Sequence, residues 1–248
     1  MRLKGGFKEI NRVGLSARKN IGSTAPKADN LVLELTFDTL SENGSKIVDT
    51  SNTVPDKQMS GVNIISGKVN NAGNFDSSRS SHIIAMNNSE AANILNEDAQ
   101  VNSYSLWFSV PSSNSNNESN SGRLLNRDPS DYWGILVNHS DPSFRFTISG
   151  GSNTSFVNFS YNTWNHIALI INRPAGYYKL YFNNSLVANE TGLESSDNSS
   201  RPLVIAEDTE EDIANRLWFS GDIDQIRAWT AELTVDDIDT LWNSGQGI

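Results

Sequence analysis

The sequence of 248 residues contains no cysteine, which excludes disulfide bonds, thiol nucleophiles and cysteine-based zinc sites. It has no run of about 20 apolar residues, so we expect no membrane insertion. Its first residues also lack the apolar segment of a secretion signal. Only three histidines are present, at His82, His139 and His166. No second ligand stands at zinc-site spacing from any of them, so we expect structural roles for all three.

Basic residues are scarce outside the N-terminus. Residues 1–29 carry seven Lys or Arg and two acidic residues, a net charge of +5, whereas the whole chain carries −10. The remaining residues therefore carry −15. An acidic body repels the phosphates of nucleic acid, so we expect no nucleic acid partner for it.

The basic N-terminal segment, residues 1–30, is predicted to be an anchoring arm. Its glycines, Gly5, Gly6 and Gly14, restrict any helix to a short piece, and we expect the segment to be disordered alone. A basic arm before an acidic body indicates docking onto other protein subunits. The residues predicted to anchor it are Arg2, Lys4, Phe7, Lys8, Ile10, Arg12, Arg18 and Lys19.

From residue 31 onward, short apolar or alternating segments are separated by loops rich in Asn and Ser. The predicted strands cover residues 31–37, 73–76, 81–86, 104–110, 134–139, 144–149, 155–160, 165–173, 178–184, 203–207, 217–222 and 223–229. Many short strands with few helices favour a β-sandwich or barrel. One short helix is predicted after the last strand, with Thr234 and Asp237 as a capping box and Gly245 as its stop.

The segment GDIDQIRAW, near the C-terminus, raises a question about two acidic residues. Strict alternation along a strand places Asp222 and Asp224 on one face with the apolar Ile226 and Ala228. A buried carboxylate without a partner is costly. We therefore expect a cation, a metal ion or water beside these acids.

Seven segments, in this order, resemble those of the laminin-G-like, or concanavalin A-like, jelly-roll domains. They are LVLELTFD, VDTSN, GKVNNAGNFDSS, SLWFSV, TWNHIALIINR, KLYFNNSLV and GDIDQIRAWTAELTVDDIDTLWNSG. The resemblance implies an all-β antiparallel sandwich over residues 31–248, with one short C-terminal helix and an extended N-terminal arm. It leaves function open, because this fold hosts lectins, adhesion modules, glucanases, lyases and viral structural proteins.

The resemblance also implies a place for a structural calcium ion. The first and last strands of the family are neighbours, which brings Asp38 close to Asp224. Related domains often hold calcium there, and Asp38, Asp224 and a backbone carbonyl near Gly73 are the implied ligands. The alternatives are that the acids are solvated, or that Asp224 pairs with Lys68 or Arg227.

The catalytic motif of laminarinase-type enzymes on this fold, E-x-D-x-x-E, is not found. The nearest approach is AEDTEEDIAN, in which Glu210 and Asp212 have the first spacing but Asn215 stands where the last glutamate is needed. We interpret this run as a solvated acidic loop. A lyase would use other residues, so an enzyme remains the alternative.

Aromatic residues beside loops are the remaining route to sugar binding, because ring faces stack on pyranose rings. The candidates, which lie at loop–strand junctions where a ring can be exposed, are Tyr132, Trp133, Tyr177 and Tyr178. For any one of them, packing in the protein is the favoured interpretation.

The sequence therefore predicts a non-catalytic binding or structural module. Its arm and its sandwich suit a virion surface protein, such as a bacteriophage decoration, collar or tail protein. In that role the arm would bind capsid or tail subunits, and a lectin-like domain would attach to glycans or surfaces. The alternatives are a glycoside hydrolase or polysaccharide lyase and an extracellular or organellar location.

Overall fold

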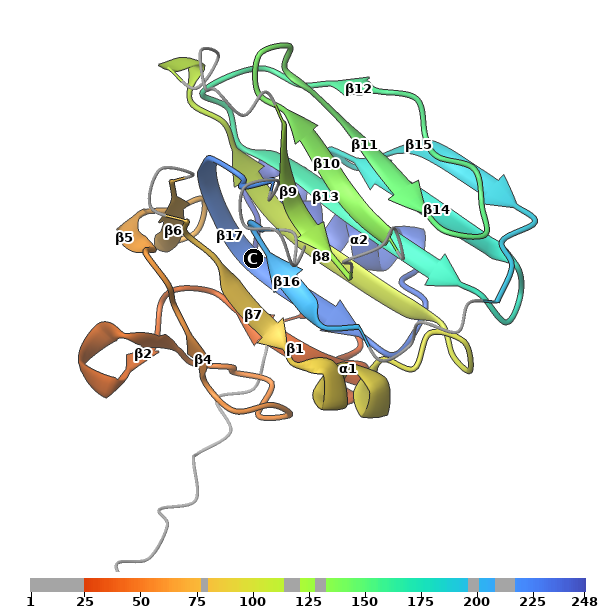
Figure 1. Cartoon of the computed structure of the whole chain (residues 1–248), viewed down its shortest axis with the longest axis horizontal. Helices are drawn as coiled ribbons and strands as arrows, with labels where there is room; N and C mark the ends of the chain where they lie inside the picture. Colours follow the sequence, from red (N-terminus) through yellow and green to blue (C-terminus); the bar gives the residue numbers. More distant parts are fainter. Residues whose placement is uncertain (1–24, 77–79, 114–120, 128–132, 196–200, 208–216) are drawn as a thin grey trace, which may run out of the picture.

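The computed structural model describes residues 25–76, 80–113, 121–127, 133–195, 201–207 and 217–248. Within these residues, two antiparallel sheets pack face to face, and a small third sheet and two short α-helices flank them (Figure 1). This architecture is the antiparallel β-sandwich that the sequence predicts. No helix among these residues has the length and apolar character needed to cross a membrane.

The larger sheet has eight strands in the order β15-β14-β13-β8-β17-β6-β5, with β1 also paired to β17. Their bounds are β1 Leu31–Leu35, β5 Asn63–Ser66, β6 Asn71–Phe75, β8 Asn102–Ser109, β13 Asn165–Asn172, β14 Tyr177–Phe182, β15 Ser185–Thr191 and β17 Gly221–Trp229. The pairing of β1 with β17 confirms that the first and last long strands are neighbours.

The smaller sheet has six strands in the order β12-β11-β10-β9-β16-β7. Their bounds are β7 Ile83–Met86, β9 Ser121–Asn126, β10 Trp133–Asn138, β11 Ser143–Ile148, β12 Val157–Asn158 and β16 Leu203–Ile205. The third sheet consists of β2 Leu40–Ser41, β3 Lys46–Ile47 and β4 Lys57–Gln58. The helices are α1 Asn88–Ile94 and α2 Val235–Trp242, with 3-10 turns η1 Ala28–Asn30, η2 Glu42–Gly44 and η6 Asn243–Gly245.

The main core lies between the two large sheets, where alternate residues of each strand point inward. Phe108 of β8 meets Phe144 of β11 edge to face, with ring centroids 6.1 Å apart. Phe146 of β11 meets Tyr178 of β14 at 4.9 Å. Each such buried side chain stabilises the fold by roughly 1.5–3 kcal/mol relative to an exposed one.

A second core lies on the outer face of the larger sheet, beneath α2. Trp229 and Ile170 of the sheet pack with Ile238 and Leu241 of the helix. The Thr234–Asp237 capping box at the start of α2 is present as the sequence predicts. In Figure 1 this helix lies behind the larger sheet, on the side away from the smaller one.

Helix α1 was not predicted, although its sequence carries a comparable signal. Asn87 caps it by accepting from the backbone N–H of Glu90, and the Glu90 side chain accepts from the backbone of Asn87. Strands β5, β9 and β15 were also not predicted. The expected separate strand over 217–222 is wrong, because β17 begins at Gly221, and the segment 155–160 contributes only the short β12.

A bulge in β17 changes the faces expected for its acidic residues. Gln225 has a φ of 52°, and the pairing with β8 shifts between Asp224 and Arg227. Ile223 and Ile226 therefore both point into the main core. The expectation that the two acids share a face with Ile226 and Ala228 is wrong, because it assumed unbroken alternation.

The described end of the predicted arm packs on the sandwich. Ala25 is buried in the second core. The carbonyl of Pro26 accepts a hydrogen bond from the indole N–H of Trp229 at 2.8 Å, and Lys27 lies 3.5 Å from Asp237. Residues 25–30 are therefore attached to the sandwich, and the predicted boundary at residue 30 falls inside packed structure.

Candidate functional site

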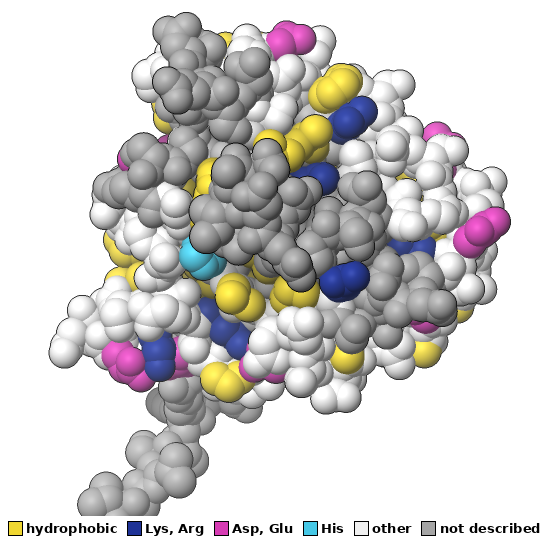
Figure 2. Space-filling view, viewed as in Figure 1, with side chains coloured by type: hydrophobic (Ala, Val, Ile, Leu, Met, Phe, Trp, Pro, Cys, Tyr) yellow, Lys and Arg dark blue, Asp and Glu magenta, His cyan; other side chains and the backbone are white. Residues whose placement is uncertain are grey.

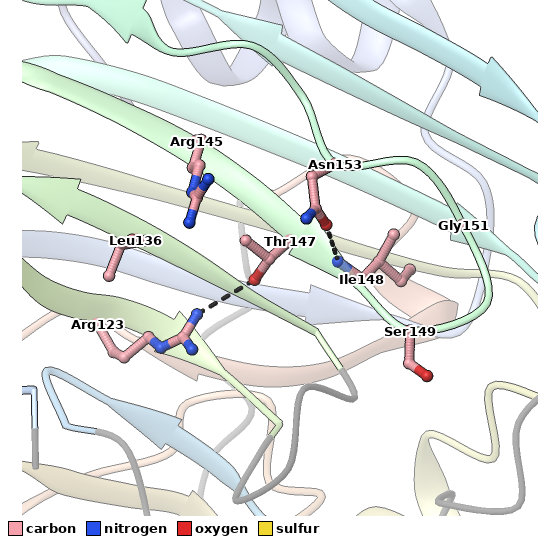
Figure 3. Close-up of a pocket in the computed structure, with 8 residues that line it drawn as sticks. All are labelled: Arg123, Leu136, Arg145, Thr147, Ile148, Ser149, Gly151 and Asn153. Carbon is pink, nitrogen blue, oxygen red and sulfur yellow. Dashed lines mark hydrogen bonds between the residues drawn. The ribbon is translucent and has the colours of Figure 1, made fainter. Parts of the chain in front are cut away.

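A pocket of about 360 Å³ lies on the outer face of the smaller sheet, over β9, β10 and β11 (Figure 3). Its volume falls within the range of small-ligand sites in proteins. The described residues that line it are Arg123, Leu136, Arg145, Thr147, Ile148, Ser149, Gly151 and Asn153.

The floor of the pocket is a row of side chains across three strands. Leu136 of β10 pairs with Arg123 of β9 on one side and with Arg145 of β11 on the other. Neighbouring strands are about 4.8 Å apart, so the Cα atoms of the two arginines are separated by roughly 10 Å. Figure 3 shows the two guanidinium groups on either side of Leu136 and Thr147.

A bulge in β9 turns Arg123 to the outer face. Leu125 pairs with Ile135 and Arg123 with Leu136, so Leu124 is the extra residue. Leu124 and Leu125 are both buried in the main core. Without the extra residue, Arg123 would lie on the inner face with Leu125, because side chains two positions apart share a face.

The Arg123 side chain is held across the sheet. Its Nη1 donates to Oγ1 of Thr147 at 3.1 Å, and the Thr147 hydroxyl donates to the carbonyl oxygen of Gly134 at 3.3 Å. A Cβ at position 134 would lie 3.0 Å from the same Nη1. Glycine at this position therefore gives the guanidinium the space in which it lies.

Arg145 lies over the ring of Phe156, with its guanidinium carbon 5.1 Å from the ring centroid. The pairing of β11 with β12, continued by one residue, places Phe156 opposite Arg145. Phe156 is 51% exposed. The cation–π contact orients the guanidinium, and an aromatic ring remains accessible beside the pocket.

Hydrogen bonds fix the loop that forms the far wall of the pocket. Oδ1 of Asn153 accepts from the backbone N–H of Ile148 at 3.1 Å, as Figure 3 shows. Oγ1 of Thr154 accepts from the backbone N–H of Phe146 at 2.9 Å. These bonds tie the loop to β11, so the wall is held in place without a bound ligand.

The described charged side chains are unevenly distributed over the face that carries the pocket. Figure 2, which views the molecule from the side of the smaller sheet, shows Lys and Arg side chains toward the middle of the coloured surface, whereas Asp and Glu side chains lie mainly toward the rim.

The aromatic residues predicted to bind carbohydrate lie elsewhere. Trp133 and Tyr178 are each 1% exposed, so their rings are packed inside the protein, as the favoured interpretation has it, and the predicted role of these two rings in sugar stacking is wrong. Trp133 donates to the Glu97 carboxylate at 3.0 Å. The Tyr178 hydroxyl donates to the carbonyl oxygen of Ser152 at 2.6 Å, and burial raises the pKa of Tyr178 to about 12.

Tyr177 is half-buried at the edge of the second core, on the opposite side of the sandwich from the pocket. Its hydroxyl donates to Glu232 at 2.5 Å, and Lys179 donates to the other oxygen of that carboxylate at 2.8 Å. Burial, followed by the hydrogen bond to Glu232, raises the pKa of Tyr177. The fourth candidate, Tyr132, lies outside the described residues.

The residues implied as calcium ligands meet at one loop, where both carboxylates accept N–H donors. Asp224 accepts from the backbone of Val69 at 2.9 Å and of Gln225 at 2.7 Å. Asp38 accepts from the backbone of Asn71 at 3.0 Å. A Cβ at Gly67 would lie 2.7 Å from Oδ2 of Asp224, so the loop backbone closes directly on this carboxylate.

This donor set does not match a calcium site. Calcium takes six to eight oxygen ligands, whereas both carboxylates are directed at N–H groups. Gly73, the third implied ligand, packs against Phe37. Among the described residues, no three side chains of His, Cys, Asp or Glu form a possible metal cluster. The calcium ion stays a prediction. Asp38 and Asp224 accept hydrogen bonds from the backbone of the loop that contains Val69 and Asn71.

The cationic partners considered for Asp224 are used elsewhere. Nε of Arg227 donates to Glu34 at 2.8 Å, and the Nζ of Lys68 lies 4.8 Å from the ring centroid of Trp107. Asp224 is fully buried, and burial, opposed by its hydrogen bonds, raises its pKa to about 7. Asp222 is half-buried and accepts from the Asn74 amide at 2.7 Å.

A serine–histidine pair in the larger sheet resembles part of a catalytic triad but lacks its properties. Ser105 and Nε2 of His166 are 2.8 Å apart, and both residues are buried. Burial, followed by the charge of Arg227, lowers the pKa of His166 to about 3. Its Nδ1 has no hydrogen-bond partner among the described atoms, so no acid orients the ring as a general base requires.

Two further sets of sequence candidates lie outside the described residues. They are the acidic run with Glu210, Asp212 and Asn215, and the arm residues Arg2, Lys4, Phe7, Lys8, Ile10, Arg12, Arg18 and Lys19.

Residues 77–239 match the family described as the concanavalin A-like lectin/glucanases superfamily (Laminin_G_3). The chain belongs to this family, as the order of its sequence segments indicated. The family description names both lectins and glucanases, so membership leaves binding and catalysis open. No curated protein matches the chain.

Several solved toxin domains share the fold. The binding domain of Paraclostridial Mosquitocidal Protein 1 superimposes with a TM-score of 0.65 at 20% identity, covering 88% of this chain and 53% of that one. The botulinum neurotoxin serotype D binding domain superimposes with a TM-score of 0.63 at 19% identity, covering 88% of this chain and 52% of that one. A structure of botulinum neurotoxin type C, whose cell entry depends on two ganglioside molecules, superimposes with a TM-score of 0.60 at 18% identity. It covers 88% of this chain and 51% of that one. This chain spans about half the length of these proteins.

Proposed function

We propose that the protein is a non-catalytic, lectin-like binding module that holds a glycan on the outer face of its smaller sheet. The observation that carries this proposal is the pocket over β9, β10 and β11, with its hydrogen-bonding rim and the exposed ring of Phe156 beside it. Saccharides require both kinds of contact, because their hydroxyl groups form hydrogen bonds and their ring faces pack on aromatic rings.

The composition of the pocket favours binding over catalysis. Glycosidases place two carboxyl groups on either side of the bond that they cleave. The eight described residues that line the pocket include two arginines and no acidic residue. A carbohydrate-active enzyme, either a glycoside hydrolase or a polysaccharide lyase, remains the second candidate because the family description includes glucanases.

The solved structures that share the fold support a binding role without identifying the ligand. They are binding domains of toxins. One neurotoxin among them depends on gangliosides for cell entry, and another was solved in complex with rat synaptotagmin II. At identities of 18–20%, these ligands are only a guide to the kinds of partner worth testing.

A glycan array probed with the full chain tests the proposal. We expect binding to a subset of glycans, reduced about fivefold or more in Phe156→Ala, since stacking on an aromatic side chain contributes on the order of 1–3 kcal/mol. The matched control is Leu186→Ala on β15, which is also 51% exposed but lies in the larger sheet. An array without any bound glycan would overturn the proposal, and release of products from a polysaccharide panel would favour the enzyme.

We also propose that residues 1–24 anchor the module to other protein subunits, as in a virion decoration, collar or tail protein displayed on the particle surface. The charge contrast between the arm and the acidic body supports this role. Deleting residues 1–24 should abolish assembly with the partner and leave glycan binding intact, because the residues that line the pocket lie between Arg123 and Asn153. Assembly by the truncated chain would contradict an anchoring arm.

The structural calcium ion has its own test. Because Asp38 and Asp224 accept N–H donors, we expect the same melting temperature in calcium chloride and in chelator. Stabilisation that increases with calcium concentration would instead establish a site formed by these residues, by the linkage of ligand binding to folding.

A further inference from the structure

We propose that the pocket takes an anionic saccharide, whose carboxylate or sulfate group lies between the guanidinium groups of Arg123 and Arg145. This inference rests on the proposed glycan-binding function and adds the chemical class of the ligand. The same pocket in a neutral-sugar lectin would need hydrogen-bonding groups but not two cations in one cross-strand row.

The first argument is the position of the two cations. Arg123 and Arg145 both pair with Leu136, on opposite sides, so the apolar leucine separates them on the floor of the pocket. Each guanidinium carries five N–H donors in a planar fork that matches the two oxygens of a carboxylate or sulfate. An acidic group above Leu136 would therefore meet the N–H donors of Arg145 on one side and the positive charge of Arg123, whose Nη1 is bound to Thr147, on the other.

The second argument is that Arg145 retains hydrogen-bonding capacity. Its guanidinium carbon lies over the Phe156 ring, 5.1 Å from the ring centroid, and this cation–π contact is not a conventional hydrogen bond to the N–H groups. Its Nε is shielded from solvent and has no hydrogen-bond partner among the described atoms. A buried donor of this kind is costly unless a ligand or a water satisfies it.

The third argument is the continuation of the row by Phe156. With Phe156 opposite Arg145, the row runs from Phe156 through Arg145 and Leu136 to Arg123, across four strands or about 14 Å. A sugar ring against Phe156 would place a substituent over Arg145. Phe156 and Leu136 would then face the carbon atoms of the sugar ring, and the two arginines would face its acidic group.

The fourth argument is charge contrast. Residues 30–248 carry a net charge of −15, so long polyanions such as nucleic acids are repelled by the body as a whole. A single acidic group on a saccharide escapes most of this repulsion, because charges more than about 10 Å away are screened at physiological salt. The pocket therefore suits a small anion on an otherwise neutral ligand.

The test compares the best-bound array glycan with its uncharged counterpart, by calorimetric titration of the full chain. A carboxylated glycan is compared with its carboxyl-reduced form, and a sulfated glycan with its desulfated form, which distinguishes the two sources of charge. We expect the acidic form to bind about 10-fold to 100-fold more tightly, as charge-assisted hydrogen bonds predict. Arg145→Met should remove most of this difference, and Arg145→Lys should retain part of it.

Lys46→Met is the matched control, because it also removes one positive charge but lies in the third sheet, where Lys46 pairs with Glu42. Its preference for the acidic form should equal that of the wild type. Equal binding of acidic and neutral forms, unchanged in Arg145→Met, would overturn this inference while leaving glycan binding in place. Absence of any bound glycan would overturn both proposals.

Discussion

The two outer faces of the sandwich have opposite characters. On the larger sheet, α2 and the segment 25–30 cover Trp229 and Ile170 and form a second core. On the smaller sheet, the strands β9, β10 and β11 carry a pocket whose rim is polar. Both faces hold arginine residues, but in different settings: Arg227 on the covered face is paired with a buried carboxylate, and Arg145 on the pocket face lies over the exposed ring of Phe156.

The difference separates polar residues that maintain the fold from those that can meet a ligand. Burying a charge requires a partner within the fold, and on the covered face Glu34 provides it for Arg227, with further bonds to Gln225 and the carbonyl of Ile248. On the pocket face, Arg145 is half-buried and its Nε has no hydrogen-bond partner among the described atoms. Substitutions on the covered face should therefore alter stability, and substitutions on the pocket face should alter binding.

The largest expected effect is on the covered face, in Trp229→Ala. Trp229 is fully buried and donates to the carbonyl of Pro26, so the variant should lose about 3–5 kcal/mol of unfolding free energy. Urea denaturation followed by fluorescence or circular dichroism measures this loss. Leu186→Ala, at an exposed site, should change stability by less than about 0.5 kcal/mol. Equal stability of the two variants would contradict a second core.

The second-largest change in stability is expected for the buried ion pair between Arg227 and Glu34. The side chains of Arg227 and Glu34 are 3% and 6% exposed, so Glu34→Gln leaves a buried charge without its counterion and should cost about 3 kcal/mol. The double variant Glu34→Gln/Arg227→Met removes both charges. It should be more stable than Glu34→Gln alone, because no unpaired cation remains. A double variant as unstable as the sum of two single variants would show that the pair is not coupled.

A smaller effect depends on pH and comes from His166. Its pKa is lowered from 6.5 to about 3 in the folded protein. Below pH 6.5 the unfolded chain therefore binds a proton that the folded chain does not, so His166 lowers stability as pH falls. The slope approaches about 1.4 kcal/mol per pH unit. Denaturation of wild type and His166→Gln at pH 7 and 5 measures it, because the wild type should lose on the order of 2 kcal/mol more than the variant between these two pH values.

The control for this pH effect is the hydrogen bond to Ser105. In Ser105→Ala the histidine remains buried, so stability should retain the pH slope of the wild type even if its absolute value falls. Identical slopes in wild type and His166→Gln would mean that the histidine has the same pKa in the folded and unfolded states, and would contradict the lowered pKa.

The fold could be predicted from the sequence where segments had a clear pattern. The apolar strands β8 and β13 and the capping box of α2 were confirmed, as was the pairing of β1 with β17. The bulges were not predictable, because a bulge inserts one residue without a consistent sequence signal. Gln225 in β17 and Leu124 in β9 each reverse the alternation of a strand, and with it the expected position of Asp224 or Arg123.

The candidate site was less predictable than the fold. One signal was present, since the alternation in FRFTIS places Arg145 and Thr147 on the polar face of a predicted strand. The predicted aromatic sites at Trp133 and Tyr178 are wrong because loop–strand junctions do not specify on which face a ring lies. The pocket depends on the register of three strands, which sets Arg123, Leu136 and Arg145 in one row, and register follows from tertiary packing.

The smallest expected stability change separates binding from folding on the pocket face. Arg145→Met removes a half-buried charge that touches Phe156 and pairs with no carboxylate among the described residues, so the unfolding free energy should change by less than about 0.5–1 kcal/mol. Urea denaturation of Arg145→Met and Glu34→Gln under the same conditions compares their losses of unfolding free energy. Loss of acidic-glycan binding with stability preserved would locate the effect in the pocket itself. A loss of 3 kcal/mol or more would instead make Arg145 a structural residue like Arg227, and the contrast between the two faces would fail.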